Sequence, residues 1–247
     1  MAEELSALLR TLRRRGKLNE ASLLVQQTLV NRPGDEWLKQ LAWQHAPFWW
    51  QPLHSPRCTL VRRNGMHTAL LRRLWADQFF MERFHRLAAT LPTDDAALQA
   101  LLEREHWALP EETRALHWVI EVHGVPTGLV SVVDWSLMHR RAEFLIGVLP
   151  DSSPGVAADA TYAVIAFLAS KARLEKLTAS FYTNNPQALA LAEKLGFERE
   201  GVLREHIRAL DGTRSDLVLT GLLLQPDFLM QHKRWERRLA KATASSK

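Results

Sequence analysis

The sequence predicts an α/β fold, with a mixed central sheet flanked by helices and a small all-α appendage ahead of it. Three observations support this class. Apolar residues recur at helical spacing through residues 2–33. Three β-prone stretches joined by short turns follow one another within residues 117–149, as in an antiparallel meander. Helical and strand patterns then alternate through residues 157–224, which is typical of α/β domains.

The composition indicates a globular chain. Its 247 residues are 47% hydrophobic and 24% charged, which excludes extended disorder and collagen-like or low-complexity classes. The single cysteine, Cys58, excludes an intramolecular disulfide and a cysteine-rich metal site, and no metal is predicted. No apolar run approaches the roughly 18 residues of a membrane span. The first residues lack the apolar core of a signal peptide. We therefore expect a cytoplasmic protein without a membrane span.

The net charge of +5 would suit a nucleic-acid partner, but its distribution argues against one. Residues 229–247 hold six basic residues and one acidic residue, so the rest of the chain is neutral. The basic residues of this tail recur at helical spacing, which favours a solvated helix face over contact with an acidic partner. The sequence therefore does not predict binding to nucleic acid.

The N-terminal helical pattern forms a hairpin. Gly16 interrupts the pattern of residues 2–33, and Pro33 ends it. Gly16, Ala21 and Pro33 stand where a tetratricopeptide unit has its turn glycine, its packing alanine and its final proline. A generic helical hairpin is the alternative. Residues 35–45 could begin a second, incomplete unit, and so short an array must pack against the rest of the chain or a partner.

A proline-rich stretch without periodicity, residues 46–57, is the expected boundary between the appendage and the domain. Trp49 and Trp50 within it are expected to be docking anchors. Further along, Thr93 is the expected N-cap of a helix, and Gly196 is the expected glycine that ends another.

The predicted units are a helical, tetratricopeptide-like appendage at 1–50, a linker at 51–57, an α/β domain at 58–228 and a basic C-terminal helix or tail at 229–247. Within them the expected strands are 58–61, 117–123, 129–135, 142–149, 176–182, 197–207 and 216–224. The expected helices after the appendage are 68–90, as one helix or two, 93–105, 157–173, 186–195 and 227–241.

A candidate phosphate-binding loop joins the strand that ends at Leu149 to the helix of residues 157–173. Gly155 and the small residues after it allow backbone N–H groups to approach an anion, which the helix N-terminus also attracts. Many α/β proteins share this pattern, so the loop alone does not identify a ligand.

A more specific motif follows the next strand. Residues 184–197 read NNPQALALAEKLGF. This segment resembles the second signature of the GNAT N-acetyltransferases, in which a strand ends in Asn, a helix with small and apolar residues follows, and Gly-Phe opens the next strand. The matching residues are Asn185, Ala188, Leu191, Gly196 and Phe197. The order of elements over residues 58–224 also matches, in a branch resembling ribosomal-protein and spermidine acetyltransferases.

The resemblance implies transfer of an acetyl group from acetyl-CoA, the co-substrate, to an amine. It places the pantetheine arm against the strand that contains Ile146 and Val148, as a pseudo-strand. Asn185 would hydrogen-bond the cofactor arm, whereas capping of the following helix is its alternative role, and both can hold together. The N–H groups implied in pyrophosphate binding are those around Ser153, Gly155, Val156 and Ala157.

Two departures from the family pattern matter. The loop reads Ser-Ser-Pro-Gly-Val-Ala from Ser152; it lacks the usual Arg or Gln and the second glycine, which puts tight CoA binding in question. Many members also place a Tyr seven residues after the Asn to protonate the leaving thiolate. Ala192 stands there in this chain, so water or Tyr182 is left for that role.

Glu143 is the predicted general base, because members of this family often carry a Glu in the third strand that deprotonates the amine directly or through water. A salt bridge to Arg140 or Arg141 is the alternative. Asp134 is a second candidate base and, with His206, a candidate for substrate binding. A surface or satisfied polar role is the alternative for His206.

The predicted reaction is direct attack of the amine on acetyl-CoA in a ternary complex, without a metal or a covalent enzyme intermediate. Backbone N–H groups of the third strand would polarise the thioester carbonyl. The acceptor is either a protein amine recruited by the N-terminal helices or a small amine such as an amino sugar or a polyamine. A homodimer is a further expectation. The alternative function is a non-catalytic adaptor that binds a protein partner through its N-terminal helices.

Overall fold

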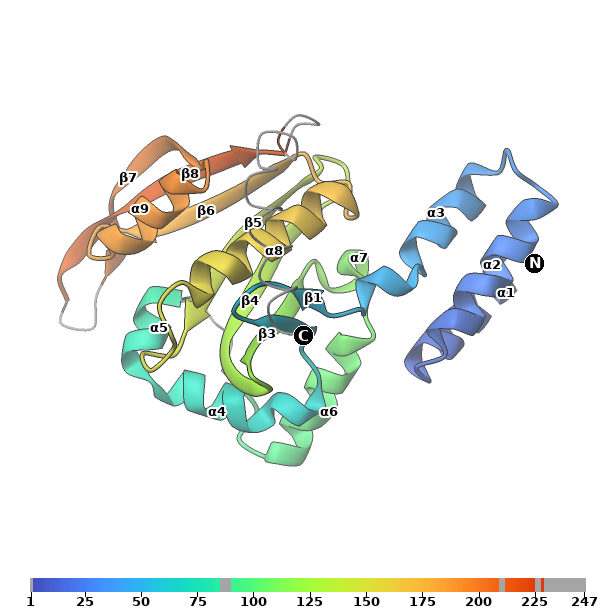
Figure 1. Ribbon diagram of the computed structural model, residues 1–247, viewed down its shortest axis with the longest axis horizontal. Helices are drawn as coiled ribbons and strands as arrows, with labels where there is room; N and C mark the ends of the chain where they lie inside the picture. Colours follow the sequence, from blue (N-terminus) through green and yellow to red (C-terminus); the bar gives the residue numbers. More distant parts are fainter. Residues whose placement is uncertain (1, 85–89, 209–211, 225–227, 229–247) are drawn as a thin grey trace.

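The computed structural model describes residues 2–84, 90–208, 212–224 and 228. Within these residues the chain forms a projecting arm of helices and an α/β domain (Figure 1). The arm, residues 2–45, contains α1 (Ala2–Arg14), α2 (Leu18–Val30) and α3 (Glu36–Gln44). A short 3-10 helix, η1 (Pro47–Trp49), leads from the arm into the domain.

The domain contains one eight-stranded sheet in the described part of the chain, in the order β1-β2-β3-β4-β5-β6-β8-β7. Its strands are β1 (Leu53–His54), β2 (Thr59–Arg62), β3 (Leu116–Val122), β4 (Val125–Ser136), β5 (Arg141–Val148), β6 (Lys176–Tyr182), β7 (Glu198–Arg208) and β8 (Arg214–Leu223). Its helical segments are η2 (Gly65–His67), α4 (Thr68–Ala76), α5 (Gln78–Phe84), α6 (Asp95–His106), α7 (Pro110–Thr113), α8 (Val156–Ser170) and α9 (Pro186–Lys194). The predicted α/β class is therefore confirmed.

The sheet is mixed because β5 and β6 run parallel while the other neighbouring strands are antiparallel. The parallel pairing is short: it runs from Arg141 opposite Lys176 to Glu143 opposite Thr178. On its other side, β5 stays paired with β4 as far as Val148. The two parallel strands therefore separate beyond Glu143, and the backbone of β5 that faces β6 leaves the ladder there.

Successive residues of each strand face opposite apolar clusters, as the pleat of a strand requires. Ala142 and Phe144 of β5 belong to the cluster that contains α8, which defines the α8 face of the sheet. Val119 of β3 belongs to the cluster that contains α4, α5 and α6, which defines the α4 face. Glu143, between two residues of the α8 face, therefore lies on the α4 face.

The expected linker contributes to the domain. Leu53 and His54 form β1, which pairs with β2, and Trp49 is only 1% exposed within the cluster of the α8 face. Trp50 donates its indole N–H to the carbonyl oxygen of His106 at 2.9 Å. Both tryptophans thus act as the predicted anchors, and the predicted linker contains the short strand β1. The outer limits of the four predicted units stay predictions.

The N-cap of α6 also differs from the prediction. Asp94, not Thr93, precedes the helix, and its carboxylate accepts the Ala97 N–H at 2.7 Å. Both residue types can cap a helix, so the local sequence did not decide between two adjacent positions. The basic helix expected at 227–241 lies outside the described residues, apart from Phe228, which is buried.

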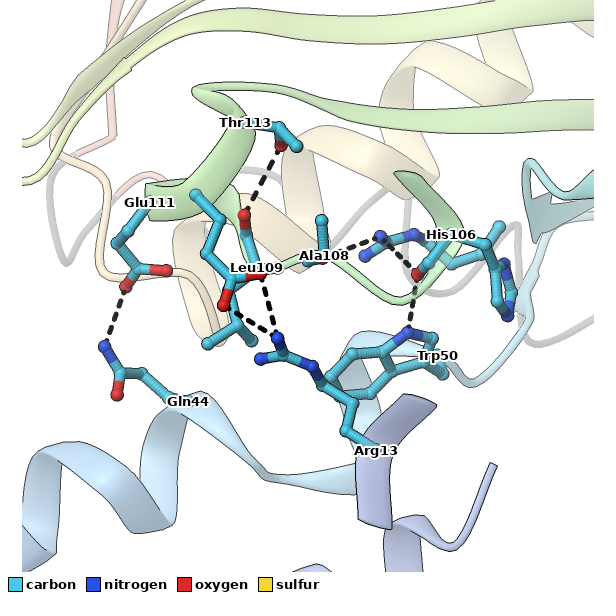
Figure 2. Close-up of polar contacts among 10 residues, drawn as sticks. Arg13, Gln44, Trp50, His106, Ala108, Leu109, Glu111 and Thr113 are labelled. Atoms are coloured by element: carbon cyan, nitrogen blue, oxygen red, sulfur yellow. Dashed lines mark hydrogen bonds and ion pairs between the residues drawn. The ribbon is translucent and has the colours of Figure 1, made fainter. Parts of the chain in front are cut away.

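The arm has a small core of its own and is held to the domain by polar contacts (Figure 2). Arg13, only 1% exposed, donates to both carboxylate oxygens of Glu112 at 2.7 and 2.8 Å. Trp43 donates its indole N–H to the carbonyl oxygen of Lys171 at 2.7 Å. The arm core consists of Leu9, Ala21, Val25, Leu38 and Leu41. The expected packing of the short array on the rest of the chain is confirmed, and its tetratricopeptide character stays a prediction.

His45, at the C-terminal end of α3, makes this contact sensitive to pH. Burial, followed by the nearby Arg13 guanidinium, lowers the pKa of His45 from 6.5 to about 4, and the Glu112 carboxylate opposes the shift. The unfolded chain therefore binds the proton more tightly, so this contribution to stability is present above pH 6.5 and lost as the pH falls towards 4. Between pH 7 and pH 5 the free energy of unfolding should fall by about 2 kcal/mol from this group.

Urea unfolding of the wild-type protein and of His45→Gln at both pH values measures this loss. In His45→Gln, the loss of unfolding free energy between pH 7 and pH 5 should be smaller than in the wild type by about 2 kcal/mol. His139→Gln, which removes an exposed histidine, is the control and should behave like the wild type. Equal pH dependence in the wild type and His45→Gln would contradict the prediction.

Candidate active site

A cleft of about 370 Å³ opens where β5 and β6 separate. Its walls are residues 144–148 of β5 and 179–182 of β6, and it reaches Ala157 of α8 and Asn185 before α9. Because β5 leaves the ladder with β6 here, its backbone polar groups on that side can bind an extended ligand as a further strand would. Ile146 and Val148, predicted to lie along the cofactor, both line this cleft.

Gly147 lets α5 approach the wall of the cleft closely. A Cβ added at this position would overlap the Phe80 ring and would lie 2.9 Å from Cδ2 of Phe84. Both rings line the cleft and stack on each other, with centroids 4.9 Å apart. The glycine therefore permits an aromatic wall on the α4 face of the cleft.

Glu143 lies in the last residue pair before the strands separate. Its carboxylate is half-buried and accepts a hydrogen bond from the Ser180 hydroxyl at 3.0 Å. The alternative salt bridge does not form: Arg140 pairs with Glu175, and Arg141 pairs with Asp134. Glu143 does not itself line the cleft, but its donor Ser180 does. A carboxylate held by such a hydroxyl, and not by a cation, is suited to accept a proton.

The two residues tied to the missing tyrosine also lie at this cleft. Tyr182, at the end of β6, lines it, and so does the buried Ala192 of α9. Tyr182 and Ser180 alternate with Phe181, which packs against the cluster of the α8 face. Tyr182, Ser180 and Glu143 therefore share the α4 face, which brings the candidate acid and base to one side of the sheet.

Asn185 caps α9 and also lies at the cleft. Its side-chain oxygen accepts the Ala188 N–H at 3.4 Å as the N-cap of α9, and the residue also lines the cleft. A cap in this position fixes the side chain at the mouth of the cleft, and its contact with a cofactor stays a prediction.

The candidate phosphate loop begins α8 with a left-handed glycine, Gly155, at φ +88°. The first N–H groups of a helix have no partner within the helix, so that of Ala157 can bind an anion, whereas the Val156 N–H donates to the Ser153 carbonyl oxygen at 3.3 Å. Ser153 precedes them in the loop. All four residues predicted from the sequence are therefore placed together at the start of α8.

Two arginines from other elements supply the cations that the loop lacks. Atoms of the Arg57 guanidinium lie 3.2 Å from the position of a Cβ on Gly155, and this side chain pairs with Asp159 at 2.8 Å. Arg73 of α4 pairs with Asp151 of the loop at 3.0 Å. Sequence reasoning missed both, because residues so far apart in the chain carry no local signal that they meet.

The two predicted substrate residues lie elsewhere. Both carboxylate oxygens of Asp134 are engaged, one by Arg114 and the other by Arg141 at 2.6 Å. Asp134 faces a second cavity, at the end of the sheet. His206 is exposed on β7 and lines neither cavity. The structure therefore does not bring these two side chains together with Glu143, and Asp134 is not available as a free base.

Two searches of the described residues gave negative results. Groups of three or more His, Cys, Asp or Glu side chains able to hold a metal ion do not occur there. Within the same ranges, every helix is too short or too polar to cross a membrane.

Comparison with known sequences identifies the fold family. The family model described as an acetyltransferase (GNAT) domain matches residues 57–198. The spermidine N(1)-acetyltransferase of Escherichia coli K12 is 31% identical over 128 residues, which cover 51% of this chain and 68% of that protein. An uncharacterised N-acetyltransferase of Bacillus subtilis is 30% identical over 103 residues, which cover 40% of this chain and 58% of that protein.

Solved structures share the fold at lower sequence identity. A spermidine N-acetyltransferase from Vibrio cholerae, in complex with CoA and spermine, superposes with a TM-score of 0.60 and 22% identity. The match covers 70% of this chain and 98% of that chain. A dodecameric structure of the Vibrio cholerae enzyme gives a TM-score of 0.59 at 21% identity, covering 71% of this chain and 98% of that chain.

Proposed function

The chain belongs to the GNAT acetyltransferase family, and on this premise we propose that it transfers an acetyl group from acetyl-CoA to a small primary amine by direct attack in a ternary complex. One observation carries the proposal: β5 and β6 separate beyond Glu143, which leaves a cleft lined by Ser180, the residue whose hydroxyl donates to the Glu143 carboxylate. The spermidine acetyltransferases that resemble this chain in sequence and fold support a small amine as the acceptor.

The cleft fits the cofactor along its length. When bound, acetyl-CoA supplies a thioester whose carbonyl carbon accepts the amine. Ile146 and Val148 provide an unpaired strand edge for its amide groups, and Asn185 lies at the mouth. Arg57 and Arg73, with the N–H groups at the start of α8, favour the negative charges of its phosphates.

Glu143 is proposed as the general base. An amine is protonated near neutral pH and must lose that proton before it can attack a carbonyl carbon. The hydrogen bond from Ser180 orients the carboxylate on the α4 face. Backbone N–H groups of β5 would polarise the thioester carbonyl. Tyr182, on the same face, or water would return a proton to the leaving thiolate.

Calorimetric titration with acetyl-CoA, followed by release of the CoA thiol over a panel of amines, tests this proposal. Binding of acetyl-CoA and turnover of small amines would support it. Failure of the intact protein to bind acetyl-CoA would overturn it and favour the non-catalytic adaptor.

Arg57→Gln is expected to raise the dissociation constant for acetyl-CoA about tenfold, because a hydrogen bond to a charged group is lost. Gly155→Asp should abolish binding, since it adds a side chain against Arg57 in a left-handed conformation and places a negative charge at the phosphates. Calorimetry measures both. Arg140→Gln removes a similarly exposed ion-paired arginine from the far end of β5 and should leave the constant unchanged. An unchanged constant in Arg57→Gln would remove this residue from the cofactor site.

A protein amine is the second candidate acceptor, because the arm exposes several apolar side chains. These are Leu8, Leu23, Val30 and Trp37. Preferential transfer of labelled acetyl groups to peptides over small amines would favour this acceptor. The dodecameric Vibrio cholerae structure supports a further proposal, that the chain forms homo-oligomers such as a dimer, which light scattering of the intact protein tests.

A further inference from the structure

A second cavity, of about 490 Å³, lies at the end of the sheet where β2 and β4 end and β3 begins. We call it the basic cavity. Its charged and titratable lining residues are Arg62, Arg63, Glu105, Arg114, His117 and Asp134. Sequence analysis assigned no role to any of these residues except Asp134.

The cavity carries an excess of positive charge. Glu105 pairs with Arg63, and Asp134 is shared by Arg114 and Arg141. The remaining guanidinium, Arg62, is 4% exposed and donates to backbone carbonyl oxygens of Trp49, His106 and Ala108. Its Nε atom is buried and has no partner in the described structure. Among the described lining residues, three guanidinium groups therefore accompany two carboxylates, one of which is also paired with Arg141 behind it.

The ionisation of neighbouring groups indicates the same positive field. Burial, followed by Arg63 and Arg13, lowers the pKa of Arg62 to about 9. Burial, followed by Arg63 and Arg62, also holds the pKa of His117 well below its usual range. Each shift means that a further positive charge is disfavoured at this place. Burial is the larger cause of both shifts and disfavours a charge of either sign, whereas the smaller contribution of the neighbouring guanidinium groups would favour an anion.

The basic cavity lies next to the proposed base. Val133, in its wall, is the register partner of Glu143 on the adjacent strand. His117 donates or accepts a hydrogen bond with Ser131 at 2.8 Å, one strand further from Glu143. Val133 and His117 lie on the α4 face, as Glu143 does. With strands about 4.8 Å apart, an anionic group in the cavity would lie roughly 5 to 10 Å from an amine at Glu143.

We propose that the basic cavity binds an anionic group of the acceptor, so that the acceptor is a small amine that also carries a carboxylate or a phosphate. The proposal rests on the proposed acetyl transfer and specifies its substrate class. A polyamine would instead bring positive charge to a place that already has an excess of it. Arg114, exposed at the rim beside Asp134, can turn towards an anion at little cost in burial.

Steady-state kinetics with matched amines tests the proposal. The amines are 1-aminopentane, 5-aminopentanoate, 5-aminopentyl phosphate and spermidine, and release of the CoA thiol is measured. We expect one of the two anionic amines to exceed 1-aminopentane at least tenfold in kcat/KM, mainly through KM, and spermidine to be the poorest. The comparison of 5-aminopentanoate with 5-aminopentyl phosphate distinguishes the two anionic groups.

A matched pair of variants assigns the preference to the cavity. Arg114→Gln should raise KM about tenfold more for the preferred anionic amine than for 1-aminopentane. Arg199→Gln is the control and should leave the KM for both amines unchanged. It breaks the ion pair of Arg199 with Glu193 on the outer strand β7. These side chains are 58% and 40% exposed, close to the 65% and 39% of Arg114 and Asp134. Equal effects of the two variants would contradict the proposal.

The possible results distinguish failure of the anionic-acceptor proposal from failure of the proposed acetyl transfer. Turnover in which 1-aminopentane or spermidine equals or exceeds both anionic amines would overturn the present inference and leave acetyl transfer standing. Absence of acetyl-CoA binding would overturn the proposed function, and this inference with it.

Discussion

Replacement of Glu143 by glutamine is expected to lower kcat by about 10²- to 10⁴-fold, which is the usual contribution of a general base. The amide keeps the shape of the side chain and an oxygen that can accept the Ser180 hydrogen bond. It removes only the ability to take up the amine proton. The dissociation constant for acetyl-CoA should therefore stay near that of the wild type, since the loss concerns the chemical step and not the binding of the cofactor.

Steady-state kinetics and calorimetry on the same preparation separate these two quantities. Glu175→Gln is the matched control, because Glu175 lies just before β6 and pairs with Arg140 outside the cleft. This control variant should leave both kcat and the dissociation constant for acetyl-CoA unchanged. A loss of less than tenfold in Glu143→Gln would mean that water or another group takes the proton, and Glu143 would then be a residue that only positions Ser180.

The regular part of the fold was predictable because its signals are local. The alternation of residues 117–149 and the motif of residues 184–197 each depend on neighbours in the chain, and both correspond to observed elements. The same motif placed Asn185 at the start of α9, where its cap is observed. Glu143 could be singled out because its strand position follows from the meander.

The positions of Arg57 and Arg73 near the candidate phosphate loop, and the basic cavity, could not be predicted from local sequence signals. Arg57 meets Gly155 and Arg73 meets Asp151 only because the folded chain brings the start of β2 and α4 to the loop between β5 and α8. The contacts of Asp134 could not be predicted for a different reason. A register shift after Val133 and a left-handed backbone at Asp134, with φ +49°, turn its carboxylate towards two arginines, and strand alternation does not predict either feature.

The proline-rich stretch before β2 contributes to the core although its sequence has no helical or strand periodicity. Trp49 lies in a stretch without a sustained helical or strand period, yet its ring packs against four others in the same cluster. The rings are those of Trp43, Phe48, Trp135 and Phe167, with centroids 5.1 to 6.1 Å from that of Trp49. Its indole N–H donates to the carbonyl oxygen of Trp43 at 2.8 Å, which satisfies its one polar group.

Trp49→Ala is therefore expected to lower the free energy of unfolding by about 3 to 5 kcal/mol, the usual loss for a buried large aromatic. That is a large share of the roughly 5 to 15 kcal/mol that stabilises a domain. Urea unfolding followed by circular dichroism measures it. Trp37→Ala, which removes a tryptophan that is 41% exposed on the arm, is the control and should change stability by about 0.5 kcal/mol or less.

The ring contacts of Trp49 determine how the loss of stability in Trp49→Ala should appear in the unfolding curve. Trp135 belongs to β4 and Phe167 to α8, so the side chain joins the segment after the arm to both layers of the catalytic domain. Loss of its ring should lower the midpoint of the whole domain in one transition, because the cavity forms inside the shared core. An early transition of the arm alone, with the domain midpoint unchanged, would contradict this and would restore the segment to the role of a linker.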